Sequence, residues 1–180
     1  YRTSDWNYPG TGINFSDETF EIPQSNNICV NNIVYGTRRC FSCGDPRNTI
    51  IANNTFMNSC YVSCVQLNTE STSTNSYFIN NIVIQEDNLY DIYNYAHTGD
   101  GSGITCSNNL FLSPANIKDY TGTNDIFGDP LIARLGNIEP GELTAEYFSL
   151  LDGSVAIDKG RTSSSVKDDF FGIPRDSKPD

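Results

Sequence analysis

The sequence contains little charge, few lysines and no long apolar run, and each shortage excludes a class of protein. Only 18% of the residues are charged, and Asn, Ser, Thr, Tyr and Gly fill most polar positions, a composition typical of strands and turns rather than helices. The formal net charge of −11 excludes a broad electrostatic attraction to nucleic acid or anionic lipid. No apolar run approaches the roughly 20 residues that a membrane-spanning helix needs, so we expect no membrane insertion.

A secretory signal peptide is not visible either, but the chain opens within a pattern at Tyr1, and we expect a mature or trimmed product. Six cysteines in a lysine-poor, Asn-rich chain indicate an oxidising compartment. Two sequons predict N-glycosylation at Asn14 and Asn53. The sequence therefore predicts an extracellular or cell-surface location.

A repeat built on an Asn-Asn pair is the strongest signal in the chain. It occurs four times, as NNICVNNIVY (26–35), NTIIANNTFM (48–57), NSYFINNIVI (75–84) and GITCSNNLFL (103–112). Consecutive copies lie about 22 to 28 residues apart, a spacing typical of stacked structural repeats. In every copy the third position before the second Asn and the second position after it are apolar, as inward-facing strand positions beside a corner would be. The copies predict stacked rungs of parallel strands.

The second Asn of each pair is the predicted corner, which gives Asn32, Asn54, Asn81 and Asn109. Stacking at about 4.8 Å places these side chains over one another, so that each amide can hydrogen-bond the next in a ladder. The first Asn of each pair then points outward. Alternatively, the pairs are ordinary turns of an antiparallel sandwich, which does not explain two apolar columns in register. The variable segments 67–75 and 86–102 are expected to be loops.

Three motifs in the C-terminal third add a family resemblance: DIFGDPLI (125–132), FSLLDGSVAIDKG (148–160) and DFFGIPR (169–175). With the Asn-Asn repeats, they resemble the rungs and closing segment of the pectate-lyase-like right-handed β-helix superfamily, where the elements usually read DPLF, SPAIDAG and D-x-x-G-x-P-R. Val155 stands where that family usually has proline. The resemblance implies an all-β, right-handed parallel β-helix solenoid with about four recognisable rungs and a C-terminal tail, and secreted polysaccharide lyases and hydrolases as relatives. It identifies architecture better than activity.

On this interpretation the chain has three parts. Residues 1–25 are an N-terminal segment that is unassigned or an incomplete rung, residues 26–115 hold the β-helix rungs, and residues 116–180 form a closing segment packed on the helix.

Four cysteines, Cys40, Cys43, Cys60 and Cys64, form two closely spaced pairs. Their spacing is compatible with a zinc site, but disulfides are favoured because both pairs follow their corner Asn at nearly the same distance. Stacked rungs would then allow the bridges Cys40–Cys60 and Cys43–Cys64. Local bridges within each pair are the tighter alternative.

The other two cysteines, Cys29 and Cys106, share one column but lie three rungs apart. That separation is too long for a disulfide. We expect both to be buried thiols that pack as small apolar side chains.

No complete catalytic constellation is evident. A lyase of this kind needs a base together with a cation or basic group, and an inverting hydrolase needs carboxylates about 6.5–9.5 Å apart. The grouped arginines Arg38, Arg39 and Arg47 lie beside the cysteine pairs. Two alternatives are open for these arginines: they face a substrate, or they lie on a solvent-exposed loop.

The segment 86–102 carries the candidates for sugar contact, namely Tyr90, Tyr93, Tyr95 and His97. Tyrosine rings can stack on sugar rings, although packing of the segment against a flank is the alternative. Asp87 and Asp100 are candidate calcium ligands, but their spacing matches no calcium loop, and we expect no metal or other cofactor.

Three functions compete. The favoured one is an extracellular, carbohydrate-associated β-helix, the C-terminal part of a polysaccharide-acting protein without a complete catalytic site in these residues. The alternative is a structural or adhesive surface protein whose β-helix protomers self-assemble into a filament, because uncapped strand edges must be covered. A third is a non-catalytic module with a polysaccharide or glycan as its partner.

Overall fold

The computed structural model describes residues 10–15, 24–60, 63–69, 73–87, 91–97, 103–113, 117–118, 122–139 and 141–180. Within these ranges the protein is all-β, and its one helix is the short 3-10 helix η1 (Ala145–Phe148). Every pair of neighbouring strands is parallel. The all-β prediction is therefore confirmed for the described residues, and the antiparallel sandwich is wrong. No described helix is long and apolar enough to cross a membrane.

Sixteen short strands form four parallel sheets. Sheet A consists, in spatial order, of β1 (Ile13–Phe15), β5 (Phe41–Gly44), β9 (Ser63–Thr69), β12 (Asp91–His97) and β15 (Ile117–Lys118). Sheet B consists of β2 (Gln24–Ser25) and β6 (Pro46–Arg47). Sheet C consists of β3 (Ile28–Val30), β7 (Ile50–Ala52), β10 (Ser76–Ile79) and β13 (Ile104–Ser107). Sheet D consists of β4 (Ile33–Tyr35), β8 (Thr55–Met57), β11 (Ile82–Ile84), β14 (Leu110–Phe111) and β16 (Ile126–Phe127).

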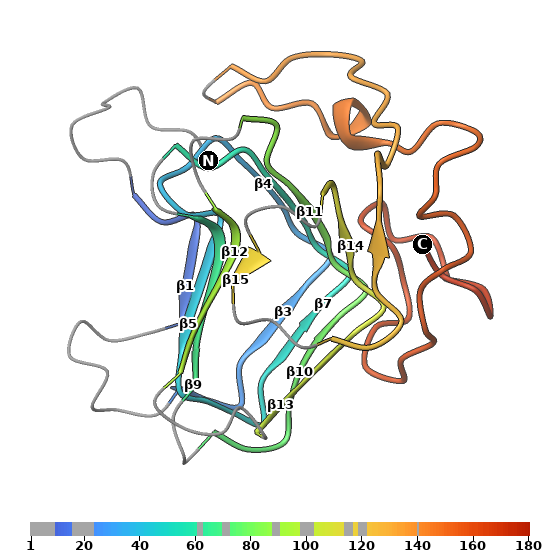
Figure 1. Ribbon diagram of the computed structural model, residues 1–180. Helices are drawn as coiled ribbons and strands as arrows, with labels where there is room; N and C mark the ends of the chain where they lie inside the picture. The colour runs from blue at the N-terminus through green and yellow to red at the C-terminus, as the bar shows by residue number, and fades with distance from the viewer. Residues whose placement is uncertain are drawn as a thin grey trace.

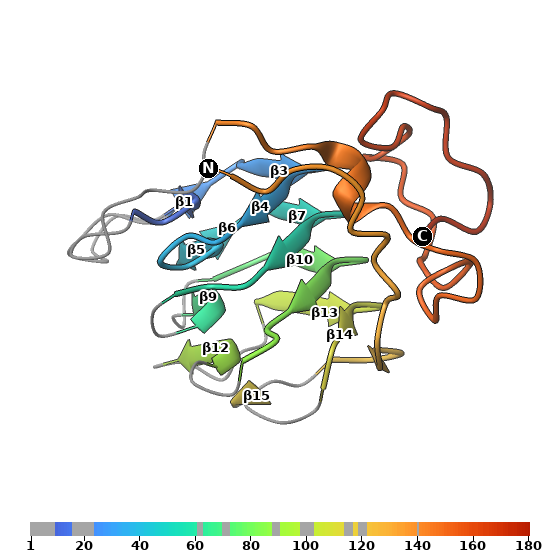
Figure 2. The same cartoon turned by 90° about the horizontal axis from the view of Figure 1, so that it is seen from above.

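The chain visits these sheets in a regular order (Figure 1). After β3 of sheet C it forms β4 of sheet D, β5 of sheet A and β6 of sheet B, and then returns to sheet C as β7. Each return adds one parallel strand beside the previous one, so that the sheets grow together from β3 and β4 toward β13 and β14 (Figure 2). The sheets remain separate, and the described strands do not close into one continuous sheet.

Sheets A, C and D face one hydrophobic core. Both apolar columns predicted from the repeat belong to it: Cys29, Ile51, Phe78 and Cys106 from sheet C, and Val34, Phe56, Val83 and Phe111 from sheet D. No side chain of either column is more than 7% exposed. Parallel pairing in register places members of each column directly over one another, as in Cys29↔Ile51 and Val34↔Phe56. The columns thus form two continuous walls of the core.

The segments 67–75 and 86–102 were expected to be loops, and the structure corrects this in part. Strands β9 and β12 lie within or overlap them and pair with each other in sheet A from Asp91↔Ser63 to His97↔Thr69. The repeat does not predict sheet A, because the strands of this sheet follow corners of unequal length. Their residues therefore keep no constant distance in sequence from the Asn-Asn pair. The register offset is 22 residues in Tyr35↔Met57 of sheet D but 24 in Phe41↔Val65 of sheet A.

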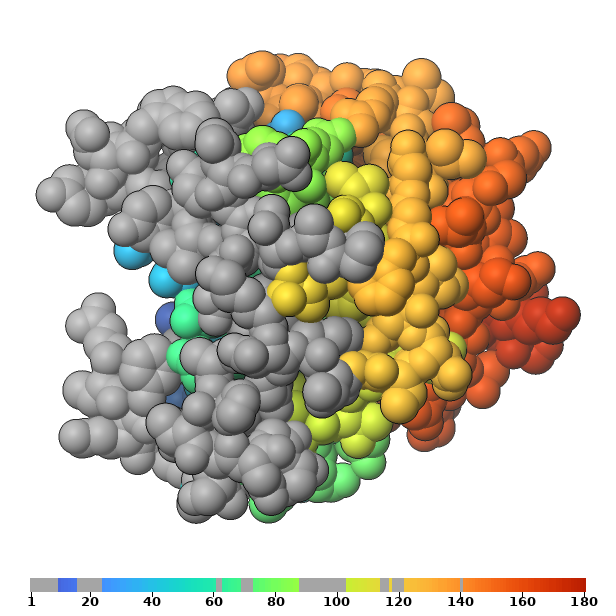
Figure 3. All heavy atoms as spheres, viewed as in Figure 1, coloured from blue at the N-terminus to red at the C-terminus, as the bar shows by residue number. Residues whose placement is uncertain are grey.

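Residues 128–180, here called the C-terminal segment, pack on the outer faces of sheets C and D (Figures 1 and 3). Ile132, Tyr147 and Phe148 cover Met57 and Ile84 of sheet D. On sheet C, Val166 covers Ala52 and Ile79. The segment therefore spans the corner between the two sheets, which is where the Asn-Asn pairs lie.

Candidate functional site

The two residues of each Asn-Asn pair have different backbone conformations. The first Asn is left-handed in every copy, with φ between 55° and 57° at Asn31, Asn53, Asn80, Asn108 and Asn124. Asparagine adopts this conformation more readily than most residues because its short polar side chain can hydrogen-bond locally. The first Asn, rather than the second, therefore makes the sharp turn of the corner, and its side chain points away from the core. We call these five residues the outer column.

The second Asn of each pair forms an inner ladder of side-chain amides. Nδ2 of Asn32 donates to Oδ1 of Asn54 at 3.0 Å, Asn54 to Asn81 at 2.9 Å, and Asn81 to Asn109 at 3.1 Å. The backbone N–H of each of these residues donates to the same oxygen of the next. Nδ2 of Asn54, Asn81 and Asn109 also donates to a carbonyl oxygen of the preceding repeat. These three side chains are at most 1% exposed, and their polar atoms are fully paired.

A fifth corner follows the four predicted copies. Oδ1 of Asp125 accepts hydrogen bonds from the backbone N–H of Asn109 at 2.7 Å and from its Nδ2 at 3.3 Å. Asp125 thus ends the inner ladder, with Asn124 in the outer column. The signal was the Asn-Asp pair at 124–125, which follows the fourth copy by 16 residues and whose aspartate had been assigned only to the DIFGDPLI motif.

The outer column binds the C-terminal segment along its length. Nδ2 of Asn108 donates to the backbone oxygen of Lys159 at 3.1 Å. Asn80 makes a two-way contact with Arg161, since its Nδ2 donates to the carbonyl oxygen at 2.7 Å and its Oδ1 accepts from the N–H at 2.9 Å. Nδ2 of Asn31 donates to the backbone oxygen of Asp168 at 2.7 Å. The outer amides therefore serve mainly as docking points for the C-terminal segment, with one longer contact within the column, from Nδ2 of Asn80 to Oδ1 of Asn53 at 3.4 Å.

A hairpin of residues 168–175 lies at the end of the outer column where Asn31 binds the C-terminal segment. An antiparallel bridge joins Asp168 to Pro174, and Oδ1 of Asp169 accepts the backbone N–H groups of Phe171 and Ile173, both at 2.8 Å. Gly172 has φ +77° in the turn, a conformation that glycine adopts without strain. The residues of the DFFGIPR element thus form a turn that the side chain of Asp169 caps.

Arg175 ends the hairpin and anchors it to the repeats. Its guanidinium donates from Nη2 to Oδ1 of Asn31 at 3.2 Å, from Nη1 to the backbone oxygen of Asp180 at 3.2 Å, and from Nε to that of Asp168 at 3.2 Å. Burial lowers the pKa of Arg175, and the nearby carboxylates of Asp169 and Asp180 act in the opposite direction. Its positive charge is thus partly desolvated and held by uncharged acceptors.

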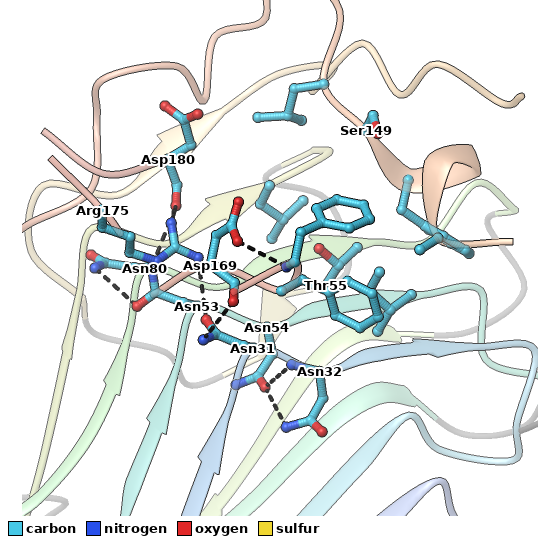
Figure 4. Close-up of a pocket in the computed structure, with 17 residues that line it drawn as sticks. Asn31, Asn32, Asn53, Asn54, Thr55, Asn80, Ser149, Asp169, Arg175 and Asp180 are labelled. Carbon is cyan, nitrogen blue, oxygen red and sulfur yellow. Dashed lines mark hydrogen bonds between the residues drawn. The ribbon is translucent and has the colours of Figure 1, made fainter. Parts of the chain in front are cut away.

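A cavity of about 190 Å³ lies between the outer column and the C-terminal segment, and we call it the clamp cavity (Figure 4). Amides of the corner line one side of it, whereas Asp169, Arg175 and Asp180 line another. Its apolar lining includes Phe148, Phe170 and Phe171. The rings of Phe170 and Phe171 meet edge to face, with centroids 5.3 Å apart, and are 48% and 55% exposed.

The polar groups of the clamp cavity favour binding over acid–base chemistry. Oδ1 of Asp169 holds the hairpin turn, and Oδ1 of Asp180 accepts the backbone N–H of Asp158 at 2.8 Å. Each of these oxygens is therefore already occupied by backbone N–H donors of the C-terminal segment. The cavity combines amides, carboxylates, a guanidinium and aromatic rings, which suits recognition of a hydroxyl-rich ligand.

No disulfide joins the described cysteines, and the bridges Cys40–Cys60 and Cys43–Cys64 expected from the spacing are not formed. The physical reason is the strand register. Cys43 pairs with Leu67 in sheet A, and the backbone N–H of Cys40 donates to the oxygen of Cys64 at 2.8 Å. The corner after β8 is two residues longer than the corner after β4, which brings Cys64 rather than Cys60 beside Cys40.

Cys29 and Cys106 are buried, as expected, at 3% and 7% exposure. Burial raises the pKa of Cys29 to about 12, and a hydrogen bond from Asn32 opposes this. Burial likewise raises the pKa of Cys43 to about 12. These thiols pack as apolar groups in the core. Among the described residues no three Cys, His, Asp or Glu side chains gather as a metal site.

Of the other candidates, Arg38, Arg39, Arg47 and Asp87 do not line the clamp cavity. Arg38 and Arg39 lie in the corner between β4 and β5, whereas Arg47 lies beyond β5 and forms an ion pair with Asp45 at 3.2 Å. Asp87 accepts a hydrogen bond from Gln85 at 2.9 Å. The backbones of Tyr93, Tyr95 and His97 belong to β12, opposite Val65, Leu67 and Thr69 of β9. Their side chains, and Tyr90 and Asp100 altogether, lie outside the described residues.

The two sequons differ in their surroundings. Asn14 is exposed on β1. Asn53 belongs to the outer column, and its Nδ2 lies 3.5 Å from the backbone oxygen of Asp180. A glycan on Asn53 would therefore compete with the C-terminal segment for the same space.

Sequence reasoning missed the clamp cavity, because its residues come from segments more than 100 positions apart, as in the contact between Asn31 and Arg175 with a separation of 144. The one indication of the cavity in the sequence was that the Asn-Asn repeat and the DFFGIPR element occur in the same chain. No protein family model matches this chain, and no curated protein is significantly similar to it.

Proposed function

We propose that this chain is part of a right-handed parallel β-helix of the pectate-lyase-like kind. The regular return from sheet D through sheet A to sheet C is the connectivity of such a solenoid. Connections between parallel strands are right-handed in about 98% of cases, which supports the handedness. The sequence elements at 125–132, 148–160 and 169–175 support the assignment to this superfamily.

We further propose that the protein lies outside the cell and binds carbohydrate in the clamp cavity. The observation that carries this proposal is the combination of exposed rings on Phe170 and Phe171 with amide, carboxylate and guanidinium groups around one cavity. Sugars present apolar C–H faces that pack on aromatic rings and hydroxyls that pair with planar polar groups. A cavity of about 190 Å³ has room for one sugar unit rather than a long chain.

The test is a binding measurement with the full chain. The protein is screened against arrays of neutral and acidic polysaccharides, and each binding sugar is titrated by isothermal calorimetry. Phe171→Ala is expected to weaken binding about tenfold, equivalent to about 1.4 kcal/mol. Ile173→Ala is the matched control, because Ile173 lies on the same hairpin and is 61% exposed but does not line the cavity. Equal losses for both variants would contradict the proposed site.

Lyase action is tested separately, since a polysaccharide-acting role does not require catalysis by these residues. Incubation with pectin, alginate and chondroitin, followed by absorbance of the unsaturated product, detects proton abstraction beside a carboxylate. We expect no product, because the carboxylates of the cavity hold backbone N–H groups. Product formation would assign a catalytic site elsewhere in the chain.

A structural role in a filament is the second candidate, and one observation favours it. Strand β3 pairs with β7 on one side only among the described residues, and its Ile28 is 64% exposed. An open strand edge of this kind can pair with another chain. Electron microscopy of the purified protein tests this role, because long filaments would support it and single particles would exclude it.

A further inference from the structure

We propose that Cys40 and Cys64 are a disulfide-forming pair, which becomes bonded when the chain folds in the presence of an oxidised thiol such as oxidised glutathione. The bond would join two consecutive repeats within sheet A. It differs from both pairings suggested by the spacing of the cysteines, and it is independent of carbohydrate binding.

The backbone places the two residues side by side. The backbone N–H of Cys40 donates to the oxygen of Cys64 at 2.8 Å. One position further along, Phe41 pairs with Val65 at the start of the parallel ladder between β5 and β9. Neighbouring strands lie about 4.8 Å apart, within the roughly 4.4–6.8 Å between Cα atoms that a disulfide tolerates.

The side chains of both residues also point to the same place. Both are fully buried in the core shared by sheets A, C and D. Their thiols are hydrogen-bond partners of each other, and Sγ of Cys40 also contacts the carbonyl oxygen of Met57 at 3.4 Å. Burial raises the pKa of Cys64, and the adjacent Cys40 adds to the effect. Burial also acts to raise the pKa of Cys40, but hydrogen bonding to Cys64 and Thr37 outweighs it and lowers the pKa, so Cys40 is the thiol of the pair that loses its proton more readily.

The other cysteines lack this arrangement. Cys43 faces Leu67 across the same two strands, so it has no thiol neighbour in that register. Cys60 donates its backbone N–H to the oxygen of Thr37 at 2.9 Å, which places it beside Thr37 rather than Cys40. The longer corner before β9 thus selects Cys64 as the partner of Cys40.

The reaction is a thiol–disulfide exchange. The thiolate of one cysteine attacks oxidised glutathione, forms a mixed disulfide and releases one glutathione thiol. The second cysteine then attacks the mixed disulfide, forms the Cys40–Cys64 bond and releases the other glutathione thiol. The protein loses two electrons and two protons, and the glutathione disulfide gains them. Because both thiols are buried in the folded chain, exchange takes place while the corner is still open during folding.

The experiment refolds the reduced, denatured full chain in a mixture of reduced and oxidised glutathione, blocks free thiols by alkylation and maps the peptides by mass spectrometry. We expect one linked peptide that contains Cys40 and Cys64, with the other four cysteines alkylated. The oxidised protein should melt roughly 5–10 °C above the reduced protein, because the bond closes a loop in the unfolded chain.

Two variants and one control sharpen the result. Cys40→Ser and Cys64→Ser should each abolish the linked peptide, whereas Cys43→Ser should retain it. A map with six alkylated cysteines, or one in which Cys43 or Cys60 is the linked residue, would overturn the proposal. The wild-type map alone decides the question if a serine variant fails to fold.

Discussion

The two residues of each Asn-Asn pair have the same side chain and are adjacent in sequence, yet they stabilise different parts of the molecule. The inner Asn54, Asn81 and Asn109 are at most 1% exposed and bond to one another and to backbone oxygens of the preceding repeats. The outer Asn31, Asn53, Asn80 and Asn108 are left-handed and bond to the C-terminal segment. The two columns use different properties of asparagine. The inner residues use the donors and acceptors of the side-chain amide, and the outer residues use the tolerance of asparagine for positive φ.

The inner column therefore contributes to the stability of the repeats, whereas the outer column attaches the C-terminal segment, which closes the clamp cavity. Loss of an inner amide leaves buried groups unpaired, whereas water can replace an outer amide once the segment lifts. Inner substitutions should therefore lower the global free energy of unfolding. Outer substitutions should act mainly on the C-terminal segment.

The largest effect is expected from Asn81→Ala. This change removes the acceptor of the backbone N–H and Nδ2 of Asn54 and a donor to Asn109. Buried unpaired groups cost about 1–3 kcal/mol each, so we expect a loss of about 3–4 kcal/mol in the free energy of unfolding. Urea denaturation followed by circular dichroism measures it. If Asn80→Ala were equally destabilising, the distinction between the columns would be wrong.

Arg175→Gln should have the next largest effect. It removes the hydrogen bonds that tie the hairpin to Asn31 and to the backbone oxygen of Asp180, with an expected cost of about 1–2 kcal/mol. Amide hydrogen exchange should accelerate in residues 168–175 while strands β7 and β10 keep their protection. Lys178→Gln, at an exposed position of the same segment, is the control. Uniform loss of protection across the repeats would show that Arg175 supports the core as well.

A comparison of Asn80→Gly with Asn80→Ala isolates the backbone conformation of the outer column. Both variants lose the bonds to Arg161, but only glycine accepts φ 55° without strain. The glycine variant should be more stable by about 1 kcal/mol. Thermal melts of the two proteins provide the measurement, and an alanine variant as stable as the glycine variant would refute the requirement for positive φ.

The smallest effect is a pH dependence at Glu86, which contacts Arg134 of the C-terminal segment and Asn58. Partial burial acts to raise the pKa of Glu86, but the hydrogen bonds from Arg134 and Asn58 outweigh it and lower the pKa. The contact therefore stabilises the fold above the unfolded pKa of about 4.3, and this stabilisation is lost as the pH falls through the lowered folded value.

Because both side chains are substantially exposed, the change should be about 1–2 °C in the melting temperature. Melts at about pH 6 and about pH 3 compare the wild type with Glu86→Gln. The difference between the two proteins should be present at the higher pH and vanish at the lower one. A difference that persists in acid would assign the effect to packing rather than charge.

The parts of the fold that the sequence predicted are those whose signal is local. The apolar positions around each Asn-Asn pair lie within five residues of one another, and the side chains of Phe56 and Phe78 are buried as their spacing indicates. Sheet A could not be predicted in the same way, because its strands follow corners of unequal length. The same inequality misled the pairing of the cysteines, since β9 pairs with β5 at an offset of 24 residues, which places Cys64 rather than Cys60 beside Cys40.

The sequence by itself determined that the chain forms parallel-strand repeats with an apolar interior, because both properties follow from residue type and spacing at each corner. Tertiary structure alone decided which cysteines are neighbours, and that Arg175 and Asn31 line one cavity. These outcomes depend on corner lengths and on contacts between distant segments, and neither is encoded in any local window of the chain.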